Sequence, residues 1–265
     1  MKLSKQGCVI SIGVFDGVHD GHRRVLQMLR ETARDRGLQS VVVTFDPHPR
    51  SVLQPARAPA MLVSVQRRLE LLESTGCVDR TYLIPFDRNQ REQAADDFVR
   101  EALIGQLGMR ALVVGENFVC GKGRVGTVEY LRQLGKSTNF SVHPVPLRVA
   151  LDAKPASSTV IRQLILDGDM RRSAQLLGRC HELVCEVGPA GELFLPKGMC
   201  IPHAGRYSVL LCQGRGATLQ ANVNIMNERG SHRCFASRAD LEPGIQVTMQ
   251  FLDLLEMVRQ EEVLA

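Results

Sequence analysis

The sequence predicts an α/β protein in which a Rossmann-like parallel sheet is followed by a small antiparallel β-barrel. Two observations predict this order of elements. Up to about residue 180, short apolar strands alternate with helical patterns five times, which requires a parallel sheet with helices on both faces. After residue 181, short segments of alternating polarity are separated by glycine and proline, as in a small barrel. We therefore expect one domain over residues 1–181 and a second over residues 182–265.

The elements of the first part follow from hydrophobic periodicity. Strands are expected at residues 8–12, 41–45, 81–86, 111–115 and 140–145. Helices are expected at residues 20–36, 64–72, 91–107 and 127–135. The strand at 41–45 is apolar throughout, so it should be buried on both faces, and the prolines at 47 and 49 should stop regular structure after it.

Ligands of such sheets bind beyond the carboxyl ends of the strands. Unusual loops fall at these ends, at residues 13–22, 46–50, 115–126 and 146–159. In the second part, strands are expected at residues 183–187, 205–211, 217–223 and 245–251.

Composition and charge narrow the class of protein. With 265 residues and 44% hydrophobic residues, the chain can bury a sizeable core. The net charge of +5 is dispersed and tryptophan is absent, so nucleic acid is not expected as a partner. The sequence shows no signal peptide, no apolar run that would span a membrane, and eight scattered cysteines without a metal-binding pattern. A cytoplasmic protein is expected, with no protein-held metal and with no indication of its oligomeric state.

The most informative segment runs from the first strand into the first helix. Gly13 and Gly17 allow a tight turn, and His19 and His22 lie three residues apart where the helix begins. A helix N-terminus offers free N–H groups and a positive dipole end, which suit a phosphate. Two such histidines taken alone are usually surface or core residues, but the strand, the glycines and the helix favour a triphosphate site. The turn residues assigned to substrate binding are Gly13, Val14, Phe15, Asp16 and Gly17.

A second phosphate-binding pattern precedes the helical stretch near residue 164. Ser157, Ser158 and Thr159 supply three consecutive hydroxyl groups, and Arg162 adds a guanidinium fork. A single serine at this position would be expected only to cap the helix, which is the alternative to phosphate binding. Three hydroxyls with an arginine after the fifth strand favour a grip on phosphate oxygens.

These segments resemble the bacterial FAD synthetase family, the bifunctional riboflavin kinase/FMN adenylyltransferases, within the HxGH nucleotidyltransferase superfamily. The resemblance rests on Gly-x-Phe-Asp-Gly-Val-His-x-Gly-His at 13–22 and Ser-Ser-Thr-x-Ile-Arg at 157–162. Residues 44–49 and 115–121 resemble two further family segments, except that Cys120 stands where an aromatic residue is usual. By this resemblance Asn117 is a substrate contact, and His48 lines the pocket or is a structural turn histidine.

The resemblance fails in the second half of the chain. A Pro-Thr-Ala-Asn segment, which holds magnesium and ATP in the family's riboflavin kinase barrel, is missing. Residues 205–209 resemble a strand of that barrel, and residues 251–255 resemble its closing strand and helix. We therefore expect a shortened, degenerate barrel without kinase activity.

The resemblance implies that the protein transfers AMP from ATP to FMN, giving FAD and pyrophosphate. His19, His22 and Arg162 would be catalytic, and Mg²⁺ would arrive bound to the substrate phosphates. Two alternatives stay open. One is the same transfer to another phosphorylated acceptor, and the other is a non-catalytic flavin- or nucleotide-binding regulator.

Overall fold

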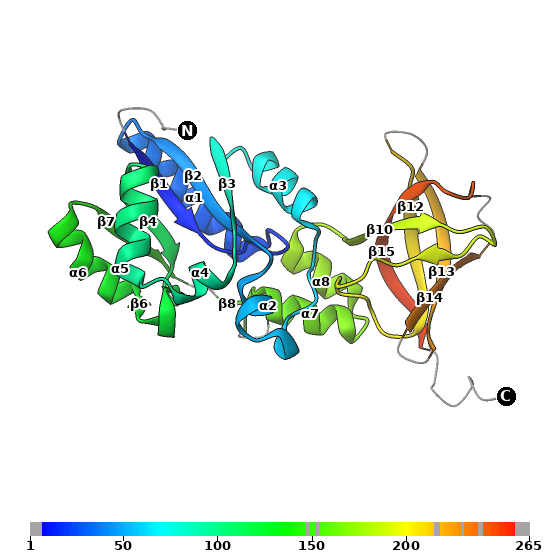
Figure 1. The fold of residues 1–265 in the computed structure, drawn as a ribbon. Coiled ribbons are helices and arrows are strands. Elements are labelled where there is room, and N and C mark those ends of the chain that lie inside the picture. The colour runs from blue at the N-terminus through cyan, green and yellow to red at the C-terminus, as the bar shows by residue number, and fades with distance from the viewer. Residues whose placement is uncertain are drawn as a thin grey trace. The chain divides into compact units, whose positions relative to one another are not determined.

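The computed structural model describes residues 7–146, 149–151, 154–214, 218–228, 231–237 and 241–257. The chain divides into two compact units. Unit 1 comprises Met1–Pro59 and Val65–Ala156, and unit 2 comprises Ala60–Ser64 and Ser157–Ala265. Figure 1 shows the elements of both. The domain boundary expected at residue 181 from the change of sequence pattern stays a prediction.

Unit 1 is built on a five-stranded parallel sheet in the order β3-β2-β1-β4-β7. Its strands are β1 (Cys8–Ile12), β2 (Gln39–Asp46), β3 (Arg80–Pro85), β4 (Met109–Gly115) and β7 (Ser141–Val145). The central strand β1 is buried at every position, and residues 40–44 of β2 are buried as well, because apolar residues face both sides of the sheet. The expected parallel α/β sheet is confirmed.

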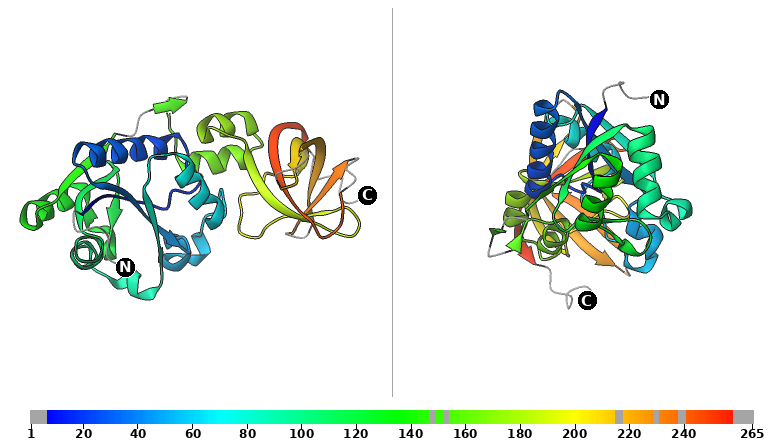
Figure 2. Two further views of the ribbon diagram at one scale, coloured as in Figure 1. Left: turned by 90° about the horizontal axis from the view of Figure 1, so that it is seen from above. Right: turned by 90° about the vertical axis from the view of Figure 1, so that its left-hand side faces the viewer.

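Helices cover both faces of this sheet, as Figure 2 shows. α1 (Asp20–Asp35) buries Val25, Leu26 and Leu29. On the other face, alternate residues of β1 and β2 pack with Phe98, Leu103 and Leu131 in one core cluster. The last of these belongs to α6 (Val128–Thr138), and α3 (Val65–Ser74) follows the segment that enters unit 2. The small pairs β5–β6 (Val119–Cys120, Gly126–Thr127) and β8–β9 (Val149–Leu151, Lys154–Pro155) and the short helix η3 (Lys122–Arg124) complete unit 1.

The single helix expected at 91–107 was wrong. The structure has α4 (Arg88–Glu92), then α5 (Ala95–Asp97), which runs into a π-helix, η2 (Phe98–Gln106). The break has a physical cause, because the Gln93 carbonyl accepts a hydrogen bond from the Lys122 backbone N–H at 3.0 Å instead of continuing the helix.

The expectation that Pro47 and Pro49 end regular structure was also wrong at the second proline. Pro49 begins the short helix α2 (Pro49–Leu53), which is followed by η1 (Pro55–Arg57). Proline suits the first turn of a helix because its missing N–H has no intrahelical partner there. His48 is the N-cap, and its Nδ1 accepts a hydrogen bond from the Arg50 N–H at 3.0 Å.

Unit 2 consists of two helices and a barrel. α7 (Ser158–Leu166) and α8 (Met170–Leu177) precede a six-stranded antiparallel sheet in the order β11-β10-β15-β12-β13-β14. A bridge between Glu192 and Phe235 joins the two ends of this order, so the sheet nearly closes into a barrel. The Ala60–Ser64 segment belongs to this unit and forms a bridge between Met61 and Met199.

Four barrel strands overlap the expected segments. They are β10 (His181–Val187), β12 (Gly205–Cys212), β13 (Thr218–Glu228) and β15 (Gln246–Met257), with the unpredicted β11 (Leu193–Phe194) and β14 (Ser231–Ser237). Residue 217, where one strand was expected to begin, lies outside the described residues. The helix suggested near residue 255 was wrong, because β15 continues to pair with β12 as far as Met257.

Candidate active site

The turn between β1 and α1 holds a strained backbone. Phe15 and Val18 adopt positive φ angles of 54° and 41°, which L-residues with side chains rarely adopt, and Gly17 has φ 83°. Each such non-glycine residue costs on the order of 1–3 kcal/mol and persists only where its surroundings fix it. Both side chains are buried. Strain of this kind concentrates at ligand-binding sites.

The structure brings the two predicted histidines together. Their rings stack with centroids 3.7 Å apart, and the Phe15 ring lies 5.1 Å from that of His22. His19 is the N-cap rather than a member of the helix, and its Nδ1 accepts a hydrogen bond from the His22 N–H at 3.4 Å. The pair therefore sits at the positive end of the α1 dipole.

The environment of His22 favours its neutral form. Burial and the neighbouring His19 hold the pKa of His22 well below its ordinary value. Its Nδ1 is buried and has no hydrogen-bond partner among the described residues. An unsatisfied buried ring nitrogen at a helix N-terminus is costly in a purely structural residue, so it supports a ligand-binding role.

Gly21, the glycine of the His-x-Gly-His pattern, is required for close packing. A Cβ placed there would lie 2.9 Å from the Ala156 carbonyl oxygen and 3.1 Å from the His19 ring. Ala156 is the last residue of unit 1 before the chain enters unit 2 at Ser157. The glycine thus lets the segment leading to the Ser-Ser-Thr motif approach the first turn of α1.

Arg68 is a site residue that the sequence analysis missed. Its side chain is 1% exposed, and its guanidinium donates to the carbonyl oxygens of Val14 at 3.0 Å and Phe45 at 2.8 Å. The hydroxyl of Thr44 donates to the same Val14 oxygen at 3.0 Å. No sequence signal identified it, because a charged residue within a helical pattern is normally solvated.

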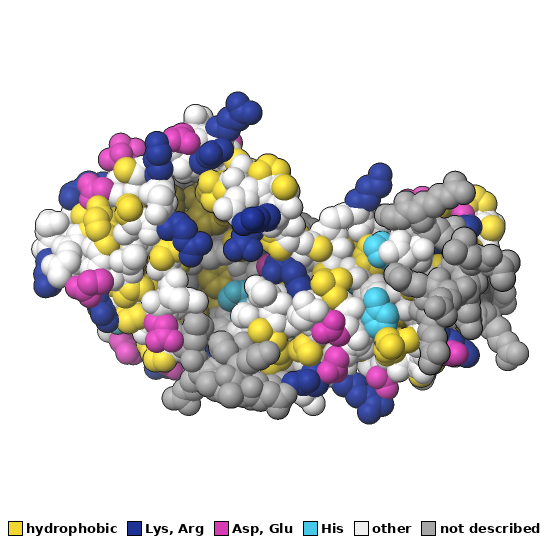
Figure 3. All heavy atoms as spheres, turned by 90° about the horizontal axis from the view of Figure 1, so that it is seen from below, with side chains coloured by type: hydrophobic (Ala, Val, Ile, Leu, Met, Phe, Trp, Pro, Cys, Tyr) yellow, Lys and Arg dark blue, Asp and Glu magenta, His cyan; other side chains and the backbone are white. Residues whose placement is uncertain are grey.

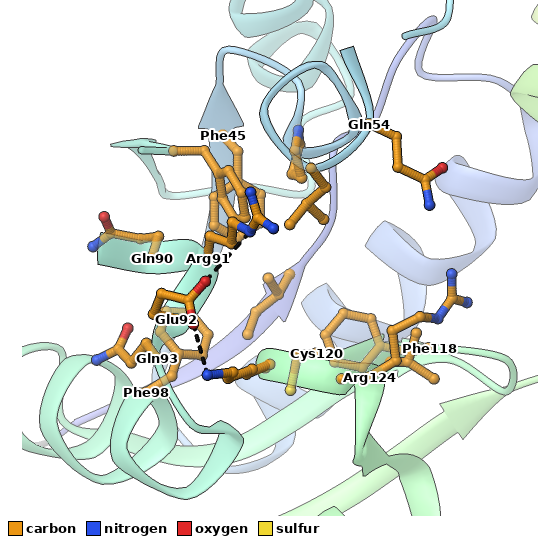
Figure 4. Close-up of a pocket in the computed structure, with 18 residues that line it drawn as sticks. Phe45, Gln54, Gln90, Arg91, Glu92, Gln93, Phe98, Phe118, Cys120 and Arg124 are labelled. Atoms are coloured by element: carbon orange, nitrogen blue, oxygen red, sulfur yellow. Dashed lines mark ion pairs between the residues drawn. The ribbon is translucent and has the colours of Figure 1, made fainter. Parts of the chain in front are cut away.

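Unit 1 also contains a cavity of about 510 Å³ at the carboxyl ends of its strands. Four phenylalanines line it, from β2, the segment after β3, the π-helix and the segment after β4. They are Phe45, Phe86, Phe98 and Phe118. Figure 4 draws the lining residues and labels Phe45, Phe98 and Phe118, and Figure 3 shows a face hollowed over hydrophobic side chains with Lys and Arg at its margin. The loops expected at 46–50 and 115–126 both contribute to this cavity.

Charged residues occupy one part of the cavity lining. Glu92 forms ion pairs with Lys122 at 2.7 Å and with Arg91 at 3.4 Å (Figure 4). Arg124 lines the cavity too and has a positive φ of 61°. The cavity therefore combines an aromatic interior with a cationic margin, a composition that fits a flat aromatic ligand carrying an anionic group.

Cys120 lines the same cavity at the position where the resemblance predicts an aromatic residue. Its Sγ lies 3.7 Å from the Gly126 carbonyl oxygen. Burial raises the pKa of this thiol to about 11, so it stays protonated and is a poor nucleophile. Its place in the lining makes it a packing residue.

Two predicted substrate contacts lie beside the cavity rather than in its lining. Asn117 is exposed in the turn after β4 and precedes the lining residue Phe118. His48 caps α2 and precedes the lining residue Pro49. Their roles as substrate contacts stay predictions.

The Ser-Ser-Thr motif belongs to unit 2. Ser157 is the N-cap of α7, and its Oγ accepts a hydrogen bond from the Val160 N–H at 3.3 Å. Ser158 and Thr159 begin the helix, and the Nε of Arg162 donates to the Ala60 carbonyl oxygen at 2.6 Å. This bond commits one edge of the Arg162 guanidinium to the backbone.

The described residues contain no group of three or more His, Cys, Asp or Glu side chains that could hold a metal ion. No helix in the described part of the chain is long and apolar enough to cross a membrane. None of the eight cysteines forms a disulfide bond.

The parallel sheet of unit 1, the glycine turn after its first strand and the histidine pair at the start of α1 all lie before residue 160. The FAD synthetase family model matches residues 1–160. The chain belongs to the FAD synthetase family.

Curated relatives agree with this membership. The chain is 38% identical over 187 residues to a bifunctional riboflavin kinase/FMN adenylyltransferase of Pseudomonas fluorescens, covering 71% of this chain and 59% of that protein. It is 34% identical over 189 residues to the enzyme of the same name from Escherichia coli K12, covering 71% of this chain and 60% of that protein. A protein named as a putative enzyme of this kind in Geobacillus thermodenitrificans is 36% identical over 176 residues, covering 66% of this chain and 92% of that protein. The chain spans about three fifths of the length of the first two relatives.

A solved structure shows the same fold. The crystal structure of a macrolide-efflux protein from Streptococcus pneumoniae matches with a TM-score of 0.84 and 23% identity, over 97% of this chain and 88% of that one. At this identity the likeness describes the fold alone.

Proposed function

We propose that this protein is an adenylyltransferase that transfers AMP from ATP to FMN, giving FAD and pyrophosphate. The observation that carries the proposal is the pairing, within unit 1, of a helix N-terminus bearing two histidines with a cavity lined by four phenylalanines. The first suits a triphosphate and the second suits a flat ring system. Membership of the FAD synthetase family supports both assignments.

In the proposed reaction, a terminal phosphate oxygen of FMN attacks the α-phosphorus of ATP. The new bond joins that oxygen to the α-phosphorus, and the bond from the α-phosphorus to the oxygen bridging to the β-phosphorus breaks. Pyrophosphate leaves with the electron pair. The protein's contribution is positioning and charge stabilisation.

Named residues take separate parts in this proposal. His19 and His22 hydrogen-bond the α-phosphate as charge develops, and residues 13–17 let the triphosphate approach the backbone. Ser157, Ser158, Thr159 and Arg162 hold the β- and γ-phosphates. The bond from the Arg162 Nε to the Ala60 carbonyl fixes the orientation of this guanidinium.

Magnesium fits this site as part of the substrate. The described residues offer no cluster of acidic or histidine ligands, so the ion would be held by the triphosphate oxygens and would offset their charge.

We further propose that the chain divides functionally at residue 181 and that the barrel lacks riboflavin kinase activity. The motif that holds magnesium and ATP in the family's kinase barrel is missing from the sequence. We also propose a cytoplasmic location, because eight scattered cysteines without a metal-binding pattern are typical of a reducing compartment.

The test is incubation of the purified chain with Mg·ATP and one acceptor at a time, followed by mass spectrometry. We expect FMN to give FAD and pyrophosphate, and riboflavin to give no FMN. Adenylylation of a different phosphorylated acceptor, with none of FMN, would replace FMN in the proposal. Tight flavin or nucleotide binding without turnover on any acceptor would instead support a regulatory protein. Formation of FMN from riboflavin would overturn the loss of kinase activity.

A further inference from the structure

Arg68 occupies an unusual position for a charged side chain. It lies on α3, is 1% exposed, and is among the largest fully buried side chains of the described residues. Its Nε is buried without an acceptor among those residues. A buried guanidinium is costly unless its other nitrogens are well bonded, so the partners of those nitrogens indicate what the residue does.

Those partners belong to the two halves of the proposed active site. One terminal nitrogen donates to the carbonyl of Val14, in the turn that leads to His19, at 3.0 Å. The other donates to the carbonyl of Phe45, whose ring lines the aromatic cavity, at 2.8 Å. A single planar group thus fixes the distance between the turn and the cavity wall.

The charge of Arg68 is balanced by acidic groups from the same two segments. Burial lowers its pKa, while the carboxylates of Asp16 in the turn and Asp46 at the end of β2 act in the opposite direction. Asp16 is itself only 2% exposed. Arginine stays protonated under these conditions, so the cation holds both segments by charge as well as by hydrogen bonds.

The turn needs such support because of its backbone conformation. Phe15 and Val18 hold positive φ angles, and these persist only where the surroundings fix them. The Thr44 hydroxyl supplies a second side-chain bond to the Val14 oxygen. Release of that carbonyl would let the Phe15 ring leave His22 and move the histidines from the helix N-terminus.

We propose that Arg68 is a positioning residue that holds the triphosphate turn in register with the acceptor cavity. This inference rests on the proposed function for the identity of the two ligands. Arg68 contacts neither ligand and acts through the backbone of Val14 and Phe45.

The experiment compares Arg68→Met and Arg68→Lys with the wild-type chain. Titration calorimetry gives the Mg·ATP dissociation constant, flavin fluorescence gives FMN binding, and NMR gives the pKa of the His22 ring. We expect Arg68→Met to weaken Mg·ATP binding at least about tenfold, to lower turnover about 10²-fold, and to raise the His22 pKa toward its ordinary value as water enters. Arg68→Lys should be intermediate, because one ammonium group does not span two carbonyls.

Two controls separate positioning from stability. Leu72→Ala on the same helix removes a fully buried side chain that bonds neither segment, so it should lower the melting temperature without changing binding. Arg67→Met changes the preceding arginine, which is 39% exposed and ion-paired with Glu70, and should change neither quantity. All measurements are made at a temperature where every variant is folded.

Thr44→Val provides a gentler variant should Arg68→Met fail to fold. It removes one hydroxyl bond to the Val14 oxygen at nearly constant volume. We expect a smaller loss of Mg·ATP binding than with Arg68→Lys. In the double variant of Thr44→Val and Arg68→Lys, the loss should differ from the sum of the two single losses, because both side chains bond one oxygen.

The outcomes are distinct for the two proposals. If the wild-type chain makes no FAD but Arg68→Lys and Thr44→Val still weaken Mg·ATP binding and shift the His22 pKa, the acceptor assignment fails and the positioning role stands. If the Arg68 variants bind Mg·ATP as Leu72→Ala does, with an unchanged His22 pKa, the positioning role is overturned. A wild-type chain that does not bind Mg·ATP overturns both.

Discussion

The two units differ in where they tolerate strain. Among the described residues, the non-glycine positions with positive φ are Phe15, Val18, Arg124 and Asn139, and all lie in unit 1. In unit 2 every described residue with positive φ is a glycine. Three of these four residues lie in the segments after β1 and β4, which form the turn before α1 and part of the cavity lining.

Two histidines with a buried ring nitrogen show the same difference. His181 in the barrel bonds the Cys200 carbonyl through Nε2 at 2.8 Å and stacks on Phe251 at 5.7 Å. The Nδ1 of His22 in unit 1 has no partner among the described residues. A satisfied histidine stabilises a fold, whereas an unsatisfied one at a helix start beside a strained turn indicates a site that a ligand completes. We therefore assign recognition to unit 1 and a structural role to the described barrel core.

The largest effect that we expect in unit 1 is on turnover. His22→Ala should lower the rate of AMP transfer by roughly 10²–10³-fold, the scale for losing one group that stabilises the transition state. Its unfolding free energy should change less than its activation free energy, because Nδ1 makes no hydrogen bond in the described structure and the loss is limited to ring contacts with His19 and Phe15. Steady-state kinetics and thermal unfolding measure the two quantities.

His143→Ala is the matched control for that variant. His143 lies on β7 and bonds Ser141 and Arg36 rather than any residue of the turn. Wild-type turnover in His22→Ala, or an equal loss in both variants, would contradict the assignment of the histidine pair.

The next largest effect concerns the stability of the barrel as a function of pH. Burial lowers the pKa of His181 to about 4, from 6.5 in the unfolded chain. The unfolded state therefore binds the proton more tightly, and the stability that the neutral ring supplies is complete above pH 6.5 and lost as pH falls toward 4. Linkage gives a loss of about 2 kcal/mol between about pH 7.5 and about pH 5.

Amide hydrogen exchange in β10 and β15 at the two pH values measures this loss. His181→Gln keeps a hydrogen-bond donor but does not titrate, so its exchange, corrected for the intrinsic pH dependence of the rates, should show a smaller difference. An identical pH dependence in the variant would mean that other groups control the acid stability of the barrel.

Much of unit 1 follows from the sequence because its signals are local. Apolar runs such as 41–45 predict buried strands, and alternation with helices predicts their parallel order. The His19–His22 pair was also predictable, since three-residue spacing at a helix start brings two rings to one side.

The features that the sequence does not predict depend on contacts between distant segments. Arg68 is identical in local pattern to a solvated helix residue, and only the fold brings it to the carbonyls of Val14 and Phe45. The break in the helix expected at 91–107 arises because Lys122 takes the Gln93 carbonyl. The four phenylalanines of the cavity come from separate elements with no shared spacing. None of these contacts leaves a periodic signal.

The smallest predicted effect concerns the aromatic rings, which differ between the units as the histidines do. In the barrel, Tyr207 and Phe251 pack on each other edge to face with centroids 5.5 Å apart, and both are fully buried. Phe118 lines the unit 1 cavity and is only partly buried. Phe118→Ala should therefore raise the KM for the flavin acceptor about tenfold, by loss of ring stacking, and leave the KM for ATP unchanged. Phe194→Ala on the barrel is the control, because that ring is 52% exposed and lies outside the cavity. A rise in the ATP KM in Phe118→Ala, or an equal rise in the acceptor KM in Phe194→Ala, would show that the cavity does not hold the acceptor ring.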